Sequence, residues 1–172
     1  RPAHQGPVRG LTRLAGALFY HLARSSPAAV VALISTKALG QGMRVLVRCP
    51  DGDTLARIDR ELWTEGGDGS FLPHGAAGGA RDADQPVLLA ASVEDGAAPA
   101  NGALCLIAVG GAPVSAAETG QFNRACVVFD GADPAQTEAA RALWRGLAAA
   151  GIGLQYWSEA SGAWVMERQT GA

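Results

Sequence analysis

Apolar residues are grouped along the chain in short, strand-length runs, and these runs alternate with longer segments whose apolar positions follow a helical period. The runs rich in valine, leucine, isoleucine and aromatic residues predict strands near 17–22, 44–49, 86–91, 103–109, 125–129 and 152–157. The segments between them predict helices near 27–39, 51–62, 115–119 and 133–150. Because strands that alternate with helices build parallel sheets, we expect an α/β fold: a single three-layer domain whose mostly parallel sheet is flanked by helices.

The ends of the predicted helices carry residues that favour capping. Ser26-Pro27 and Asp133-Pro134 each place a capping side chain before a proline at the first helical position. Asp51 and Asp53 are suited to cap the second helix, while Gly40 and Gly151 supply C-terminal stops. These local signals agree with the apolar pattern on where the helices begin and end.

One long connection interrupts the alternation. Residues 64–84 form a predicted loop of about twenty residues, a length that in compact domains is usually functional or disordered. Trp63 stands before this loop and Phe71 lies within it, followed by Leu72 and Pro73. Loops seldom keep large apolar side chains unless another molecule covers them. We therefore interpret this region as a surface that another protein covers.

The composition restricts the class of protein. The chain has 172 residues, enough for one domain with a hydrophobic core, and 48% of them are hydrophobic while 17% are charged. A net charge of −2 does not favour an obligate nucleic-acid binder, which usually shows a basic footprint. The three cysteines have no CxxC spacing and lie in or beside predicted strands, so we expect buried thiols in a reducing compartment. No apolar run reaches membrane-spanning length, and we expect a cytoplasmic protein.

The N-terminal segment does not take part in the predicted domain. It carries Arg1, Arg9 and Arg13 but lacks the long apolar segment of a secretory signal. We interpret residues 1–16 as a flexible arm or a cloning remnant, and residues 17–172 as the folded domain.

Open α/β sheets often bind nucleotides at the carboxyl ends of their strands, but the usual motifs for such a site are missing from this sequence. There is no GxxxxGK[ST] phosphate loop, and Gly110-Gly111 precedes Ala112-Pro113, which favours a tight turn. His4, His21 and His74 lack metal-ligand spacing, and no serine lies in a GxSxG elbow. We therefore expect a Rossmann-like fold without a nucleotide site, with no catalytic residues and no cofactor or metal. The alternative is a nucleotide-binding α/β enzyme that uses the C-terminal edge of the sheet.

The last predicted helix carries a distinctive group of side chains. Glu138, Arg141, Trp144 and Arg145 are three and four residues apart and share one helical face. Two guanidinium groups beside an indole suit a peptide that ends in acidic and aromatic residues with a free carboxylate. The alternative is a solvated helix face with a Glu138–Arg141 ion pair of little energetic weight.

A series of motifs runs in order through the chain. Its members are Phe19-Tyr20-His21-Leu22, Lys37 with Gly42-Met43-Arg44-Val45-Leu46-Val47, Ile58-Asp59-Arg60-Glu61-Leu62-Trp63, Ser70-Phe71-Leu72-Pro73-His74, and the helix with Arg141, Trp144 and Arg145. Together they span about residues 17–165, and the Leu-Trp and Phe-Leu-Pro-His motifs are the most specific. The series resembles the chi subunit of bacterial DNA polymerase III, a component of the clamp-loader assembly.

The resemblance implies a non-catalytic adaptor with one α/β domain. Members of that family join a small subunit, psi, to the clamp loader and bind the acidic, phenylalanine-ending tail of single-stranded DNA-binding protein. By position, the residues that the resemblance implies would bind the tail are Arg141, Trp144 and Arg145. Those in the region that would face a psi-like subunit are Trp63, Phe71, Leu72 and Pro73. DNA would be contacted indirectly, through these partners, and no membrane would be involved.

Overall fold

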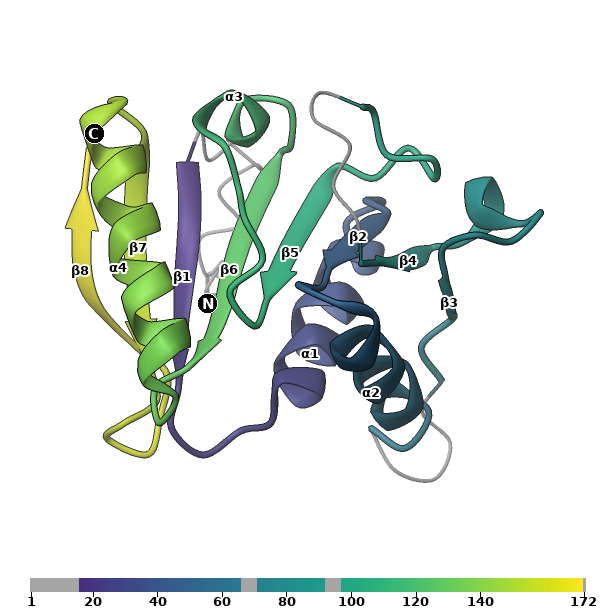
Figure 1. Cartoon of the computed structure of the whole chain (residues 1–172), viewed down its shortest axis with the longest axis horizontal. Coiled ribbons are helices and arrows are strands. Elements are labelled where there is room, and N and C mark those ends of the chain that lie inside the picture. The colour runs from purple at the N-terminus through teal and green to yellow at the C-terminus, as the bar shows by residue number, and fades with distance from the viewer. Residues whose placement is uncertain (1–15, 66–70, 92–96, 172) are drawn as a thin grey trace, which may run out of the picture.

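The computed structural model describes residues 16–65, 71–91 and 97–171, and within them it confirms the α/β prediction (Figure 1). One sheet has the strand order β3-β4-β2-β5-β6-β1-β7-β8, and every neighbouring pair is parallel except β7–β8. The strands are β1 (Gly16–Leu22), β2 (Val45–Arg48), β3 (His74–Ala76), β4 (Val87–Ala90), β5 (Cys105–Val109), β6 (Arg124–Asp130), β7 (Gly153–Ser158) and β8 (Val165–Thr170). The predicted arm, apart from Gly16, lies outside the described residues.

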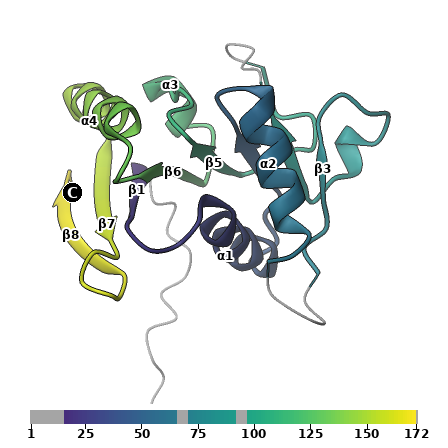
Figure 2. The ribbon, with the colours of Figure 1, turned by 60° about the horizontal axis from the view of Figure 1, so that its bottom comes forward.

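Helices cover both faces of the sheet. They are α1 (Pro27–Gly40), α2 (Gly52–Leu62), α3 (Ala116–Thr119) and α4 (Pro134–Ala149), with a 3-10 turn, η1, at Asp82–Asp84. Figure 2 shows α3 and α4 on one face and α1 on the other. Ile34 of α1 and Ile58 of α2 are buried in one apolar cluster, whereas Ala140 and Leu147 of α4 belong to a second cluster across the sheet. In the part of the chain that the structure describes, no helix is both long and apolar enough to cross a membrane.

Most of the expected caps are formed. Of the predicted N-cap residues, Ser26, Asp51 and Asp133 accept backbone N–H groups through their side chains, whereas Asp53 lies in the first turn of α2. Gly151 follows α4 with φ of 77°, a conformation that favours glycine, so this predicted stop is confirmed. The end of α1 differs from the prediction, because Gly40 is still helical and the left-handed residue is Gly42, with φ of 78°.

Two short strands were not predicted. β3 lies inside the segment expected to be a loop, and it has only three residues, one of them Gly75. β8 follows the last predicted strand as the second arm of an antiparallel hairpin, and five of its six side chains are exposed. Neither strand has the alternating apolar pattern by which sequence predicts strands.

The three cysteines are free and buried, as expected from their positions. Burial raises the pKa of the Cys49 thiol to about 12, and Asp51 nearby acts in the same direction. The environment of Cys49 therefore holds its thiol in the neutral form, which packs as a small apolar side chain.

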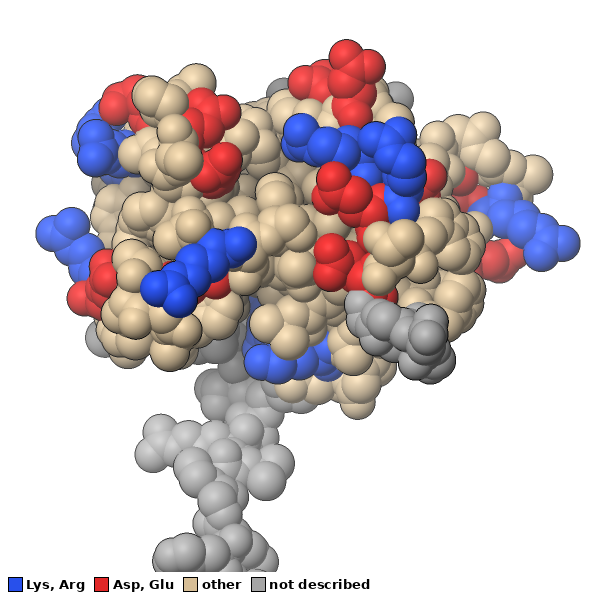
Figure 3. Space-filling view, turned by 90° about the horizontal axis from the view of Figure 1, so that it is seen from below, with Lys and Arg blue, Asp and Glu red and all other residues tan. Residues whose placement is uncertain are grey.

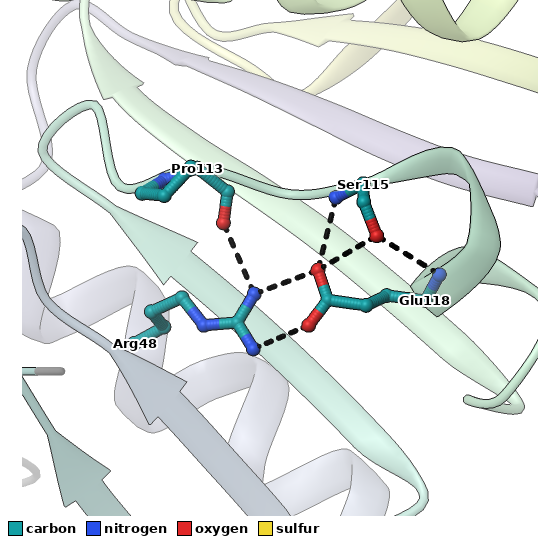
Figure 4. Close-up of polar contacts among 4 residues, drawn as sticks. All are labelled: Arg48, Pro113, Ser115 and Glu118. Carbon is teal, nitrogen blue, oxygen red and sulfur yellow. Dashed lines mark hydrogen bonds and ion pairs between the residues drawn. The ribbon is translucent and has the colours of Figure 1, made fainter. Parts of the chain in front are cut away.

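A buried ion pair fastens the end of β2 to the segment that contains α3 (Figure 4). The Arg48 guanidinium donates to both carboxylate oxygens of Glu118, at 3.1 and 2.7 Å, and to the Pro113 carbonyl at 3.0 Å. Ser115 donates its backbone N–H to the same carboxylate at 2.9 Å. Burial alone would raise the pKa of Glu118, but the hydrogen bonds from Arg48 and Ser115 outweigh it and hold the pKa below the usual value. The pair is therefore ionised and well satisfied.

Candidate functional site

A pocket of about 380 Å³ lies between α4 and the strands β1, β6, β7 and β8. Its floor is aromatic and comes from alternate positions of three strands: Phe19, His21, Phe129 and Tyr156. In the parallel register His21 pairs with Phe129, and Phe19 pairs with Tyr156. Because residues paired across neighbouring strands point to the same face, the register brings these four rings together under α4.

The rings of the floor hold one another in fixed positions. The His21 ring lies 5.2 Å from that of Phe129, centroid to centroid, and its Nδ1 is 2.6 Å from the Tyr156 hydroxyl. Trp144 from α4 completes the group, with edge-on contacts of 5.1 Å to Phe19 and 6.0 Å to Tyr156. Edge-to-face packing and a hydrogen bond therefore leave little freedom in the pocket floor before any ligand arrives.

The wall formed by α4 contains all three residues predicted for the tail site. Arg141, Trp144 and Arg145 line the pocket together; the two arginines are exposed and Trp144 is half-buried. Arg145 approaches Glu138 at 3.4 Å, and both side chains are about two-thirds exposed. The ion pair on this face thus uses Arg145 in place of the Arg141 considered from sequence, and pairs so exposed contribute little to stability.

The pocket is cationic. Its lining includes Arg141 and Arg145 of α4 and Arg168 of β8, and it includes no aspartate or glutamate. Burial raises the pKa of the Tyr156 hydroxyl, Glu167 adds to that effect, and the positive charge of Arg141 opposes it. Arg141 thus lines the same pocket as the aromatic floor and is close enough for its charge to act on Tyr156.

The two exposed aromatic residues predicted from the loop also lie together. Trp63 and Phe71 are 58% and 69% exposed, and their ring centroids are 5.8 Å apart. Pro73 is half-buried beside them, whereas Leu72 is buried in the core beneath. Exposed apolar side chains that cluster in this way mark surfaces for binding other proteins.

His74 supports this aromatic surface from below. Its ring lies 4.6 Å from the Trp63 ring and is buried. Its Nδ1 is 2.8 Å from the Leu72 carbonyl, and its Nε2 is 3.2 Å from both the backbone carbonyl and the carboxylate of Asp59. The histidine therefore ties the segment after Phe71 to α2.

The C-terminal edge of the sheet is where a nucleotide would bind in a fold of this class. The chain leaves the neighbouring strands β1 and β6 toward opposite faces, to α1 and α4, and such a point is the usual ligand crevice. Here the His21 ring occupies the space in which any side chain at Gly131 would lie. In the described residues, no group of three or more histidine, cysteine, aspartate or glutamate side chains is arranged to hold a metal ion.

The loop between β1 and α1 forms an anion-binding turn that the protein fills with its own carboxylate. The backbone N–H groups of Ala23, Arg24 and Ser25 donate to Oε1 of Glu159 at 3.0, 2.8 and 2.6 Å. The Ser25 hydroxyl donates to Oε2 at 2.8 Å. Burial works against ionisation, but these donors lower the pKa of Glu159 to about 2. Glu159 thus uses the backbone N–H groups ahead of α1, which are donors of the kind that bind phosphate in anion-binding turns.

Charges of both signs are mixed on the face that contains the C-terminal ends of β1 and β6. Figure 3 shows blue and red side chains interspersed there, with tan surface between them. This face lacks the continuous basic surface by which proteins bind the phosphate backbone of nucleic acids.

Sequence reasoning missed several residues of the pocket. Tyr156 and Phe129 lie in correctly predicted strands, but only the strand register shows that they meet Phe19 and His21. The alternation of side chains along each strand predicts which residues share a face of the sheet. It does not predict which strands are neighbours. The sequence did not indicate Arg168 as a pocket residue, because its strand was not predicted.

The family of the chain follows from comparison with known proteins. A model of the DNA polymerase III chi subunit family, HolC, matches residues 15–155. Comparison with curated proteins gave no match. The family match includes most of the sheet, α4 and the exposed aromatic pair. The chain belongs to the DNA polymerase III chi subunit family.

Proposed function

We propose that this protein is a replication adaptor, which binds the C-terminal tail of single-stranded DNA-binding protein with one surface and a psi-like subunit of the clamp loader with another. Membership in a family of polymerase III accessory subunits supports a role in replication, and hence in the cytoplasm of a bacterium. The observation that carries the proposal is the pocket under α4, in which aromatic rings and arginines converge without a carboxylate.

The chemistry of the pocket matches that of an acidic tail ending in phenylalanine. The terminal phenyl ring is expected to lie on the floor formed by Phe19, Phe129 and Tyr156, where edge-to-face contacts are available. Arg141, whose charge acts on that floor, is positioned to pair with the terminal carboxylate through a charge-assisted bond. Arg145 is placed one helical turn further along α4 for an acidic side chain of the tail.

The psi-like partner is assigned to Trp63 and Phe71. Two large rings that are more than half exposed contact each other, and a buried histidine contacts the Trp63 ring, so they form a preorganised apolar surface. Leu72 contributes by anchoring the segment after Phe71 in the core, and Pro73 by restricting its backbone.

The two surfaces are far enough apart to be occupied at once. The aromatic pair lies by α2 and β3 at one edge of the sheet, and the pocket lies over β1 and β7 near the other edge (Figure 1). Adjacent strands are separated by about 4.8 Å, so β3 and β7 are about 30 Å apart. Simultaneous binding would raise the local concentration of the clamp loader at protein-coated single strands, even if each contact were weak.

The alternative, a nucleotide-binding enzyme, is disfavoured by Glu159 in the β1–α1 loop. A thermal-shift screen with ATP, GTP and NAD tests it, because a ligand at a hundred times its dissociation constant stabilises the folded state by about 2.7 kcal/mol. A clear stabilisation by any of the three would favour the alternative.

Titration calorimetry with an acidic peptide ending in phenylalanine tests the tail site. Arg141→Ala is expected to weaken binding about tenfold, because the peptide carboxylate loses a paired donor. Arg81→Ala is the matched control, since Arg81 is an exposed arginine beside β4, far from the pocket in the strand order. Equal affinity of the wild type and the Arg141→Ala variant would remove Arg141 from the site.

A further inference from the structure

The pocket has a second cationic wall, which comes from β8. This strand spans Val165–Thr170 and lies beyond the residues that the family model matches, which end at 155. Arg168 pairs with Tyr156 in the antiparallel register, and Tyr156 belongs to the pocket floor. Residues directly opposite one another in such a pair have their Cβ atoms about 5 Å apart on one face, so Arg168 rises beside the Tyr156 ring on the face that α4 covers.

The register of the hairpin changes next to Arg168. Tyr156 pairs with Arg168, but Trp157 pairs with Met166, so Glu167 is the extra residue of a β-bulge. Bulges redirect the side chains around them and are frequent beside binding sites. Here Met166 joins Trp157 on the opposite face, while Arg168 remains on the face of the pocket.

Arg168 and the α4 arginines stand on different sides of the floor. Arg141 acts on Tyr156 from the helix above, and Arg168 lies beside Tyr156 from the edge strand. Arg168 is exposed, and no aspartate or glutamate lines the pocket with it. An anionic ligand that extended out of the pocket across β7 and β8 would pass this charge.

We propose that Arg168 of β8 binds the acidic residues that precede the terminal phenylalanine of the tail, so that the tail lies between two cationic walls. This inference rests on the proposed function of the pocket. Arg141 of the α4 wall holds the terminal carboxylate and Arg145 is available to one acidic side chain, while Arg168 of the β8 wall selects ligands with further negative charge upstream. β8 thereby contributes to specificity for acidic tails, beyond the part of the chain that the family match covers.

Two peptides ending in phenylalanine test the proposal, one with aspartates before the terminus and one with asparagines in their place. Arg168→Gln is expected to weaken binding of the aspartate peptide about two- to fivefold and to leave the asparagine peptide nearly unchanged. Arg168→Lys, which keeps the charge, should retain most of the affinity for the aspartate peptide. Arg81→Gln, at the other edge of the sheet, should match the wild type, and thermal unfolding of each variant controls for folding.

Each result decides between distinct outcomes. If Arg168→Gln leaves both affinities unchanged, or weakens binding of both peptides equally, Arg168 does not bind the acidic residues and the proposal is overturned. If Arg141→Ala weakens binding while Arg168→Gln does not, the tail site stands and only the role of β8 is lost. If the wild-type protein binds neither peptide, the tail site itself is wrong, and the proposal for Arg168 is overturned with it.

Discussion

Replacing Glu159 with glutamine is expected to destabilise the fold and to change its response to acid. The Glu159 carboxylate accepts three backbone N–H groups and the Ser25 hydroxyl, which lowers its pKa from 4.5 to about 2. Each pKa unit corresponds to about 1.4 kcal/mol, so the charged form stabilises the native state by up to about 3 kcal/mol. Ala23 and Arg24 are exposed and solvent screens part of this effect, so we expect a loss of about 1–3 kcal/mol at pH 7.

The sign of the pH dependence follows from the direction of the shift. Because the folded-state pKa lies below the unfolded value, the stabilisation is fully present above about pH 5 and is lost as the pH falls toward 2. Glu159→Gln has no charge to lose at this position. The difference in stability between wild type and variant should therefore shrink steadily from pH 5 to pH 2.

Urea denaturation across this pH range is the assay, with the free energy of unfolding extrapolated to water. Glu167→Gln serves as the matched control, because Glu167 is an exposed carboxylate on the neighbouring strand β8 and should change the stability by less than about 0.5 kcal/mol. Identical unfolding free energies for the wild type and Glu159→Gln at pH 7, or a difference that does not depend on pH, would refute the assigned role of the carboxylate.

Three further predictions concern the buried pair, the aromatic surface and the tail site. Arg48→Met should destabilise the fold by about 3–5 kcal/mol in urea denaturation, because Glu118 is left buried without its partner. The double variant with Glu118→Leu should recover much of this loss. An Arg48→Met variant as stable as the wild type would contradict this prediction. Trp63→Ala with Phe71→Ala should abolish co-purification of a small partner or the clamp loader yet leave tail-peptide affinity unchanged, whereas loss of both activities would indicate misfolding. Peptide affinity should fall as the ionic strength rises, since exposed charges are screened. The affinity of the Arg141→Ala variant should fall less steeply with salt than that of the wild type. A wild-type affinity that does not depend on salt would contradict binding through ion pairs.

Much of the α4 wall could be predicted from sequence, because it depends on local periodicity. Arg141, Trp144 and Arg145 share a face by spacing alone, and Asp133-Pro134 fixes where the helix begins. The exposed aromatic pair was predictable for a similar reason, since large apolar residues beside a long loop are unusual. The strand–helix alternation likewise identified the fold class without any long-range information.

The floor of the pocket and the second cationic wall depend on contacts between distant segments. Tyr156 meets Phe19 through the β1–β7 pairing, which no local pattern specifies. Arg168 lies on a strand whose side chains are nearly all exposed, so the strand lacks the apolar alternation that would reveal it. Glu159 fills the β1–α1 turn from more than 130 positions away along the chain, and a single glutamate in a hairpin gives no sign of such a partner.

The most direct test of the central claim is binding of the protein to immobilised single strands coated with single-stranded DNA-binding protein, compared with strands coated by the same protein lacking its C-terminal residues. The account predicts that the wild-type chain binds the intact coat, that removing the tail abolishes binding, and that Arg141→Ala weakens binding to the intact coat about tenfold. Equal binding to coats with and without the tail would contradict the assignment of the pocket under α4.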